Sequence, residues 1–326
     1  MKKIIITGAT SMLGTVLIEV AIRENSEVYA VVRPDSNKID RIISSPLVHV
    51  VYASLENLNE IDGLPFDCDV FYHFAWAGTS KAERDDPKIH EKNILYTLNA
   101  VEAAERFGCR RFIFAGSQAE YGIVDGIIDE KTKFNPVTSY GISKYAAGIL
   151  SRKLCEKKGL EHIWGRIFSV YGPHDSQETM LNYALDCFIK GKPAKFSSGT
   201  QFWNYLYETD AGEMLYRLGL DYVPADTYFV ANPESQILKK YIEVLMKVYA
   251  GNVKVEFAHA TSVKTSNLNV DTRKTANVLK YEPQVNFEEG VRKMLENKYH
   301  VSEGGGVSHR VIFFMRVPSF EGRLAA

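Results

Sequence analysis

Residues 3–14 read Lys-Ile-Ile-Ile-Thr-Gly-Ala-Thr-Ser-Met-Leu-Gly, and this stretch decides the fold. The apolar run is typical of a strand, and it leads through a glycine turn into helical spacing that begins at Met12. Backbone N–H groups at the start of a helix, together with the helix dipole, favour a bound phosphate. Gly8 permits the tight turn, Gly14 lets the helix pack closely on the sheet, and Ser11 replaces the middle glycine of the usual pattern. The diphosphate of a nucleotide is therefore expected at Gly8, Thr10, Ser11, Met12, Leu13 and Gly14.

The rest of the first half repeats this alternation of short apolar runs and helical patterns. Strands are predicted at 3–7, 28–32, 47–52, 70–74, 111–115 and 162–168, and helices at 12–23, 87–107 and 139–157. The central strands are almost continuously apolar, as expected for a parallel sheet covered by helices on both faces. The sequence predicts an α/β fold, with a Rossmann-type doubly wound parallel sheet and a smaller mixed α/β substrate lobe on the C-terminal side.

After residue 173 the pattern changes to helical stretches at 180–190, 237–249 and 287–297, separated by longer polar connections. We expect residues 1–168, with part of about 204–232, to form the nucleotide-binding domain. Residues 169–203 and 233–302 are expected to form the substrate-binding lobe. Residues 303–326 contain three consecutive glycines and an apolar run without a clear period, which indicates a tail or a non-native extension.

Composition narrows the class of protein. The 326 residues carry 39 Lys and Arg against 40 Asp and Glu, a net charge of −1 that argues against a broad nucleic-acid-binding face. The four cysteines lie far apart, without a CxxC pair or nearby histidines, so neither a metal site nor a disulfide framework is expected. No apolar run approaches the roughly 18 residues that span a bilayer, and the one at the N-terminus is too short for an export signal. A cytoplasmic protein without membrane or nucleic-acid partners is the expectation.

A catalytic set is predicted from three residues. Tyr140 and Lys144 stand four positions apart at the start of a predicted helix, so they project from the same face. A tyrosine with the ordinary pKa of about 10 is a poor proton donor or acceptor at neutral pH. A neighbouring lysine ammonium, aided by an oxidised nicotinamide, would lower that pKa and prepare Tyr140 for proton transfer. Ser117, at the end of the strand predicted at 111–115, is the candidate that polarises a substrate oxygen.

The end of the second predicted strand bears on the choice of cofactor. An acidic residue there would bind the ribose 2′-hydroxyl of NAD, whereas an arginine suits the 2′-phosphate of NADP. Arg33 occupies this place, and Lys38 follows closely. NADP is therefore favoured. NAD remains open, because Arg33 would also fit as a solvated charge at a strand end.

Several motifs together resemble one known family. They are residues 7–14, 73–76, Asn93, Ser117 four residues before Tyr121, Tyr140 with Lys144, and 166–173. Over residues 1 to about 297 the chain resembles the extended short-chain dehydrogenases/reductases, in the NAD(P)-dependent nucleotide-sugar epimerase/dehydratase family. The resemblance implies that Ser117 and Tyr140 contact the reacting sugar oxygen and that Lys144 holds the cofactor ribose. It further implies cofactor contacts at Ala75, Asn93, Phe168 and Val170, and a homodimer formed through helices 87–107 and 139–157.

Departures from the family pattern indicate which reaction to expect. Dehydratases of the family carry an Asp-Glu pair directly after the catalytic hydroxyl, but here Gln118 and Ala119 follow Ser117, and Glu120 is one position late and expected to point elsewhere. Hydride transfer at a ring carbon remains. Because a reductase must exchange its reduced cofactor every turnover, Arg33 favours NADPH-dependent reduction of a nucleotide-linked 4-keto-6-deoxy sugar. The alternatives are a nucleotide-sugar epimerase that retains NAD and, less expected, a reductase of a non-sugar ketone. A non-catalytic NADP-binding protein is disfavoured by the intact catalytic set.

Fewer motifs mark the substrate side. Trp203 and Asn204 stand where the family often has Arg-Asp, and the family's arginine there helps to hold the substrate diphosphate. Arg273, just before a stretch at 279–283 that resembles the family's late motif, could take its place. Substrate contacts are expected at Trp76, Gln118, His174, Asn204 and Arg273.

Overall fold

The computed structural model describes residues 1–259 and 266–302, so the predicted tail at 303–326 lies outside the described residues. Its main sheet has seven parallel strands in the order β12-β7-β5-β4-β1-β2-β3. The strands are β1 Lys3–Thr7, β2 Glu27–Val32, β3 Val48–Tyr52, β4 Val70–His73, β5 Arg111–Ser117, β7 Glu161–Ile167 and β12 Thr227–Val230. The strand order reverses between β1 and β4, and doubly wound sheets bind ligands beyond the carboxyl ends of the strands at such a point. The predicted α/β fold is confirmed.

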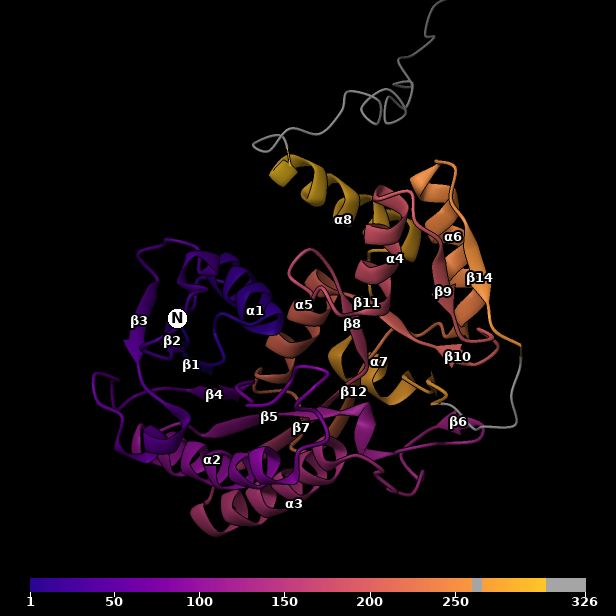
Figure 1. Ribbon diagram of the computed structural model, residues 1–326. Helices are drawn as coiled ribbons and strands as arrows, with labels where there is room; N and C mark the ends of the chain where they lie inside the picture. The colour runs from indigo at the N-terminus through magenta and orange to yellow at the C-terminus, as the bar shows by residue number, and fades with distance from the viewer. Residues whose placement is uncertain (260–265, 303–326) are drawn as a thin grey trace, which may run out of the picture.

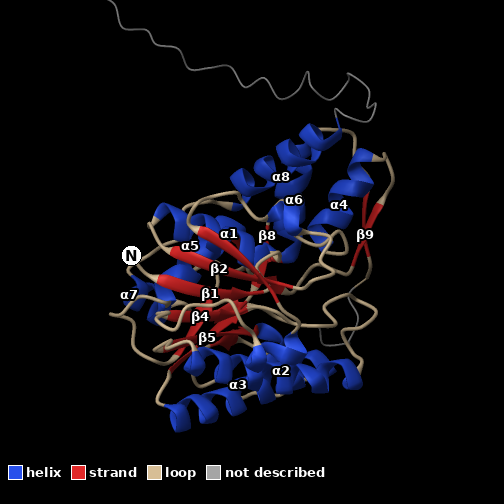
Figure 2. Cartoon of the chain, turned by 90° about the vertical axis from the view of Figure 1, so that its left-hand side faces the viewer, coloured by secondary structure: helices blue, strands red, loops and turns tan. Residues whose placement is uncertain are grey.

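Helices cover both faces of this sheet (Figures 1 and 2). On one face α1 (Met12–Arg23) packs against α5 (Glu208–Leu218). On the other face α2 (Pro87–Arg106) packs against α3 (Ser139–Lys158). The predicted helices at 12–23, 87–107 and 139–157 therefore end within one residue of the observed ones.

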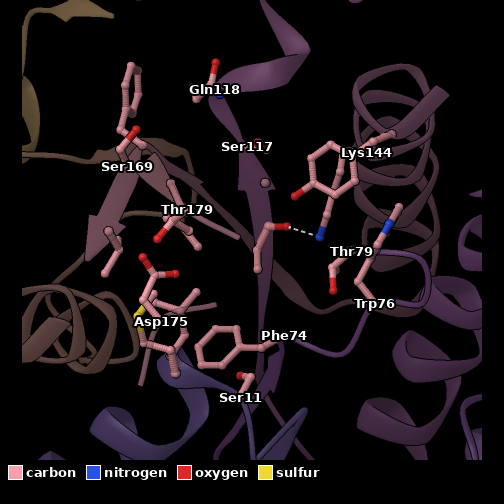
Figure 3. Close-up of a pocket in the computed structure, with 18 of the residues that line it drawn as sticks. Ser11, Phe74, Trp76, Thr79, Ser117, Gln118, Lys144, Ser169, Asp175 and Thr179 are labelled. Carbon is pink, nitrogen blue, oxygen red and sulfur yellow. Dashed lines mark hydrogen bonds between the residues drawn. The ribbon is translucent and has the colours of Figure 1, made fainter. Parts of the chain in front are cut away.

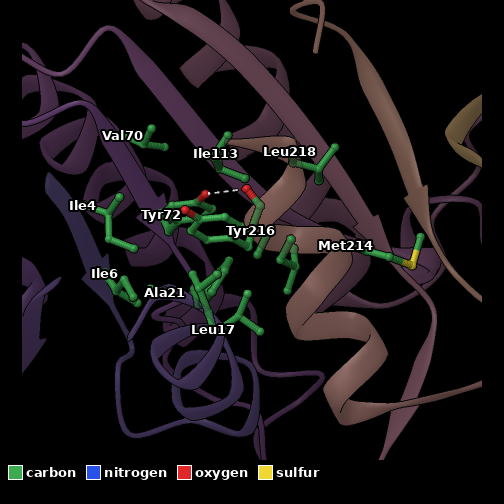
Figure 4. Packing of buried hydrophobic residues seen from close by; sticks show 14 of the residues in the cluster. Ile4, Ile6, Leu17, Ala21, Val70, Tyr72, Ile113, Met214, Tyr216 and Leu218 are labelled. Carbon is green, nitrogen blue, oxygen red and sulfur yellow. Dashed lines mark hydrogen bonds between the residues drawn. The ribbon is translucent and has the colours of Figure 1, made fainter. Parts of the chain in front are cut away.

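The two faces of the sheet carry separate hydrophobic clusters. Ile4 and Ile6 belong to the cluster shared with α1 and α5, whereas Ile5 between them belongs to the cluster under α2 and α3. Figure 4 shows the first of these clusters, in which the buried Tyr72 hydroxyl donates a hydrogen bond to the backbone oxygen of Tyr216 at 3.1 Å. Since both faces are buried, the central strands are largely apolar, which is why they stand out in the sequence.

The glycine turn after β1 has the expected tight geometry. Gly8 has a φ of +70°, and a Cβ there would lie 2.7 Å from the backbone nitrogen of Ala75. A Cβ on Gly14 would lie 2.3 Å from the Gly8 oxygen, so the helix approaches the turn as closely as glycine permits. Ser11 is the N-cap of α1 and accepts the N–H of Gly14 at 3.1 Å. The serine thus ends the turn and begins the helix, a role that a glycine would fill without the side-chain bond.

The remaining elements are helices, 3₁₀ helices and short strands outside the main sheet. They are the helices α4 Met180–Ile189, α6 Leu238–Tyr249, α7 Arg273–Leu279 and α8 Phe287–Ser302, the 3₁₀ helices η1 Ile39–Arg41, η2 Leu55–Glu60 and η3 Gln118–Glu120, and the strands β6 Ile127–Ile128, β8 Ser169–Tyr171, β9 Ala194–Phe196, β10 Phe202–Trp203, β11 Tyr205–Tyr207, β13 Gln236–Ile237, β14 Val255–Phe257 and β15 Asn269–Val270. A third hydrophobic cluster, rich in aromatic residues, joins α4, α6 and α8. Figure 1 shows where these three helices lie.

Asp210 on α5 fixes the segment that follows α7. Its buried carboxylate accepts hydrogen bonds from the Tyr281 hydroxyl at 2.6 Å and from the backbone N–H groups of Gln284 and Val285 at 2.9 and 3.0 Å. These three bonds tie the segment after α7, which includes the stretch resembling the family's late motif, to α5. They have no direct part in the cavity described next.

Candidate active site

A cavity of about 570 Å³ lies at the carboxyl ends of β1, β4 and β5, opposite the start of α4 (Figure 3). This volume is typical of small-molecule sites, which span about 300–1,000 Å³. The predicted site residues that line it are Ser11, Met12, Leu13, Trp76, Ser117, Gln118, Tyr140, Lys144, Phe168 and Val170. The fold therefore brings the glycine turn and the predicted catalytic set into one cavity.

Lys144 is held tightly inside this cavity. Its side chain is 4% exposed, and its ammonium donates a hydrogen bond to the backbone oxygen of Ala115 at 2.8 Å (Figure 3). The ammonium also lies 3.8 Å from the centre of the Trp76 ring, a cation–π contact. Burial lowers the pKa of Lys144 to about 7, because the charged form loses its hydration.

Tyr140 lies against a cation that the sequence did not predict. Burial raises the pKa of Tyr140, while the guanidinium of Arg84 and a hydrogen bond with Ser117 lower it. The Arg84 Cζ atom lies 4.1 Å from the centre of the Tyr140 ring, and Arg84 lines the cavity. Trp76 and His90 contact the same ring edge-on, with centroid distances of 6.1 and 5.6 Å. Arg84 lies in an irregular polar segment before α2, where periodicity carries no signal.

The buried carboxylate of Glu120 holds the backbone of Ser117 in position. Glu120 is fully buried and accepts the backbone N–H of Ser117 at 2.7 Å, while the Ser117 hydroxyl accepts the N–H of Ala119 at 3.2 Å. The other Glu120 oxygen accepts Arg166 Nε at 2.7 Å. Burial raises the pKa of Glu120, and Arg166 opposes this shift. Glu120 points away from the cavity as expected, because it is committed to this ion pair.

Asn93 and Ala75, two predicted cofactor contacts, do not line the cavity. Each forms hydrogen bonds near the segment that follows β4. Asn93 accepts the N–H of Ala77 at 2.8 Å and donates to the Ala77 oxygen at 3.0 Å and to the Ile89 oxygen at 3.3 Å. The N–H of Ala75 is bonded to the Thr7 hydroxyl at 3.4 Å. Asn93 therefore fixes the segment that carries Trp76.

Arg33 and Lys38 do not line the cavity. Arg33 follows β2 with 66% of its side chain exposed, and its nearest carboxylate is that of Asp35 at 3.9 Å. Lys38 is exposed directly before the first 3₁₀ helix. Neither position shows a preformed clamp for a 2′-phosphate.

Three predicted substrate contacts also lie outside the cavity. His174 Nδ1 is bonded to the Glu208 carboxylate at 2.9 Å. Asn204 is fully buried and exchanges hydrogen bonds with the backbone of Asn232 at 2.7 and 2.9 Å. Arg273 is bonded to Asp271, and 87% of its side chain is exposed. The first two carry structural contacts, and the third lies on the surface.

Asp175 and Trp203 do line the cavity. Figure 3 shows Asp175 at the end away from Lys144. Burial raises the pKa of Asp175 to about 6, although a hydrogen bond with Thr179 opposes this shift. The indole N–H of Trp203 is buried and has no hydrogen-bond partner among the residues that the structure describes. This donor is the one polar group of the residue that replaces the family's arginine.

Residues 4–229 match the family model described as the NAD dependent epimerase/dehydratase family. The chain belongs to this family. It is thus an enzyme of the extended short-chain dehydrogenase/reductase type, as the resemblance implied.

Relatives in this family share low identity but long coverage. An uncharacterized UDP-glucose epimerase, YtcB, of Bacillus subtilis is 22% identical over 309 residues, covering 89% of this chain and 95% of its own length. A UDP-glucuronate 4-epimerase of Thermodesulfobacterium geofontis is 27% identical over 228 residues, covering 68% of this chain and 69% of its own.

Solved structures of family members share the fold. The UDP-N-acetylglucosamine 4-epimerase of Methanobrevibacter ruminantium, in complex with UDP-N-acetylmuramic acid, has a TM-score of 0.81 at 19% identity, covering 93% of this chain and 99% of that one. The UDP-glucuronic acid 4-epimerase of Bacillus cereus, in complex with UDP-glucuronic acid and NAD, has a TM-score of 0.79 at 20% identity, covering 92% and 99%. NAD is the cofactor named for such neighbours, so the preference for NADP expected from Arg33 is not supported.

Two other expectations concern metals and membranes. Within residues 1–259 and 266–302, no group of three or more His, Cys, Asp or Glu side chains could hold a metal ion. Among the same residues, no helix has the length and apolar character needed to cross a bilayer.

Proposed function

We propose that this protein is a nucleotide-sugar 4-epimerase that retains its NAD through the catalytic cycle. The observation that carries the proposal is the composition of the cavity wall around Ser117. Tyr140 and Lys144 stand beside it, the two residues that follow it are uncharged, and Glu120 is committed to Arg166. Elimination of water needs a second acid–base pair next to the hydroxyl, whereas oxidation and reduction at one carbon need only one proton carrier.

The residues at the turn fit a dinucleotide. Ser11, Met12 and Leu13 place the first turn of α1 on the cavity, and a Cβ on Gly8 would fill the close approach between the turn and the segment after β4. The bound NAD would supply a hydride acceptor and donor. We assign NAD rather than NADP because Arg33 is largely exposed and lies near Asp35, whose negative charge would oppose a 2′-phosphate.

A single tyrosine suffices for both halves of an epimerisation. Tyr140 would accept the proton of the sugar 4-hydroxyl during oxidation and return a proton to the keto oxygen during reduction. Ser117 would hold that oxygen, and Lys144 would orient the cofactor ribose. The reaction has no net oxidation, so the enzyme consumes no external reductant. A cavity of about 570 Å³ gives the keto intermediate room to present its other face.

The nucleotide end of the substrate would lie in a second groove of about 730 Å³, which shares Met180 with the first cavity. Its exposed lysines are Lys81, Lys190, Lys192 and Lys195. Lys195 lies 3.6 Å from Glu256, and the other three form no ion pair within the described residues. We infer that these lysines attract the diphosphate in place of the arginine that Trp203 replaces, a role in which the exposed Arg273 has no part.

The division of the chain, the assembly and the location follow as further proposals. We infer that residues 169–203 and 233–302 bind the substrate, while 1–168 with part of 204–232 binds NAD. A homodimer would form through α2 and α3, whose outer faces carry exposed apolar side chains, among them Leu95, Ile142 and Leu150. The four cysteines are free thiols, which suits the cytoplasm.

The test measures bound cofactor and product together. Protein purified without added cofactor is denatured, and the released nucleotide is quantified by mass spectrometry. Native protein is incubated with UDP-glucose, UDP-N-acetylglucosamine or UDP-glucuronate, again without cofactor, and the products are separated by chromatography. We expect stoichiometric NAD and conversion of at least one UDP-sugar to its 4-epimer, with Tyr140→Phe as the inactive control. A protein that converts none of these sugars, and reduces an added 4-keto-6-deoxy UDP-sugar only when NADPH is supplied, would be a reductase instead.

A further inference from the structure

Arg84 is the nearest cation to the catalytic tyrosine. Its guanidinium carbon lies 4.1 Å from the centre of the Tyr140 ring, whereas the ammonium of Lys144 lies 5.9 Å from the same point. Arg84 comes from the segment between β4 and α2, and Lys144 comes from α3, so the two cations approach Tyr140 from different elements. Both line the cavity.

The segment that carries Arg84 is fastened to the start of α3. The backbone N–H of Tyr140 donates to the Arg84 oxygen at 3.2 Å. Ser139 adds two bonds to Asp85, from its backbone N–H to the carboxylate at 2.8 Å and from its hydroxyl to the backbone oxygen at 3.1 Å. The backbone at Arg84 is therefore fixed beside Tyr140, and the guanidinium lies on the Tyr140 ring. A charge placed before the substrate arrives is the condition for an electrostatic contribution to catalysis.

The two cations differ in what else holds them. Lys144 is bonded to the Ala115 oxygen and lies on the Trp76 ring, and burial lowers its pKa to about 7. Arg84 forms no ion pair with any residue that the structure describes. A guanidinium also keeps its proton at every pH at which proteins work. Arg84 is thus the permanent positive charge beside Tyr140.

The other titratable groups around Tyr140 do not supply the positive charge that Arg84 provides. His90 on α2 contacts the Tyr140 ring edge-on, and burial lowers the pKa of His90, which favours its neutral form. Glu120 on the 3₁₀ helix after β5 acts in the opposite direction and raises the pKa of Tyr140, although Arg166 offsets its charge.

We propose that Arg84 is a second cation, in addition to Lys144, that prepares Tyr140 for proton transfer. The proposal rests on the proposed function for the part Tyr140 plays, but not for the electrostatics of the Tyr140–Arg84 contact. The same contact would be made with any substrate that Tyr140 serves. It assigns a positioning role to a residue that no motif marks.

The test uses three variants. Arg84→Met removes the charge and keeps an unbranched side chain, and Arg84→Lys restores a charge. Lys88→Met removes an exposed cation at the start of α2 as a matched control. In the pH dependence of kcat, the acidic limb reports the tyrosine that must be deprotonated. Loss of a cation in contact should move this limb up by about one pH unit, which is about a tenfold lower rate at pH values below it. Arg84→Lys should keep the limb near that of the wild type, and Lys88→Met should leave it unchanged.

A second measurement needs no substrate. Protein labelled with ¹³Cζ-tyrosine and saturated with NAD is titrated by NMR, and the Tyr140 resonance is identified by its absence in Tyr140→Phe. Arg84→Met should raise the pKa of Tyr140 even if no UDP-sugar is turned over, so failure of the proposed substrate class is distinguished from failure of this inference. An unchanged Tyr140 titration, or a kcat lowered equally at every pH, would overturn it. So would a rise in KM confined to UDP-glucuronate, since Arg84 would then bind the substrate carboxylate.

Discussion

Replacing Arg166 by methionine should expose how strongly the ion pair beneath Ser117 holds the nucleotide-binding domain together. Arg166 Nε donates to the fully buried Glu120 carboxylate at 2.7 Å. Breaking a buried pair by removing one partner costs about 3–5 kcal/mol, because the remaining charge is left without compensation. The Arg166 guanidinium also lies on the Phe134 and Trp164 rings, at 4.3 and 4.4 Å, and methionine retains part of this apolar contact. The expected loss in the free energy of unfolding at pH 8 is therefore about 3 kcal/mol or more.

The loss should depend on pH in a definite direction. Burial already raises the pKa of Glu120, and Arg166 is the main influence that opposes the rise. Without Arg166 the folded-state pKa moves further up, so the folded protein keeps a proton that the unfolded chain releases near pH 4.3. Stability then falls as the pH rises above about 4.3, by up to about 1.4 kcal/mol per unit, until the folded-state pKa is passed. Arg166→Met should be closest to the wild type near pH 5 and weakest near pH 8.

Urea unfolding at pH 5 and pH 8 measures both effects. The series comprises the wild type, Arg166→Met, Glu120→Gln and the double variant, which contains neither charge. We expect the double variant to be more stable at pH 8 than the sum of the two single losses predicts, by more than about 1 kcal/mol. Equal losses at the two pH values, together with additive single losses, would refute the idea that an uncompensated carboxylate is the cause.

Three further predictions concern the cavity and its groove. Tyr140→Phe should lower kcat by about 10²–10⁴-fold while bound NAD, measured after denaturation, stays at the wild-type level, because only the proton carrier is removed. Gly8→Ala should lose bound NAD and lower the free energy of unfolding by about 1–2 kcal/mol. Gly8 has a φ of +70°, and the new Cβ would lie 2.7 Å from the nitrogen of Ala75. Retention of NAD by this variant would argue against a role of the glycine turn in binding the cofactor. Lys190→Gln combined with Lys192→Gln should raise KM for a UDP-sugar several-fold at low salt and have less effect at high salt, because exposed charges are screened; a salt-independent change in KM would contradict an electrostatic role.

Much of the fold could be predicted because the central strands of its sheet are buried on both faces. The helix over Pro87–Arg106 was also well marked, since Asp86 caps it and Pro87 begins it. By contrast, α5 and β12 were not predicted as elements. α5 follows directly on β11, and β12 is the edge strand of the main sheet, beside β7. Both are defined by packing against distant segments, which a local pattern does not contain.

The residues of the candidate site likewise fall into those that local spacing predicts and those that only tertiary contacts place. The residues of the glycine turn and the set of Ser117, Tyr140 and Lys144 are fixed by short-range spacing, and the fold brings them to one cavity. Arg84 is brought there by an irregular segment that is bonded to α3 across the chain, so its spacing carries no information. Arg273 was considered because of its charge and its place before the stretch that resembles the family's late motif. Its position on the surface depends on tertiary contacts that neither feature reveals.

The fate of the hydrogen at C4 tests the central claim most directly. A UDP-sugar substrate identified in the panel is prepared with deuterium at C4 and incubated with the purified enzyme, and the product is examined by NMR and mass spectrometry in the presence of unlabelled NADPH. An epimerase that retains NAD should return the same deuterium to C4 of the inverted sugar, so that substrate and product carry the label in full. Replacement of the deuterium at C4 by unlabelled hydrogen would contradict the retention of one NAD through the cycle. Retention of the deuterium without inversion, together with NADPH-dependent reduction of an added 4-keto-6-deoxy UDP-sugar, would establish a reductase.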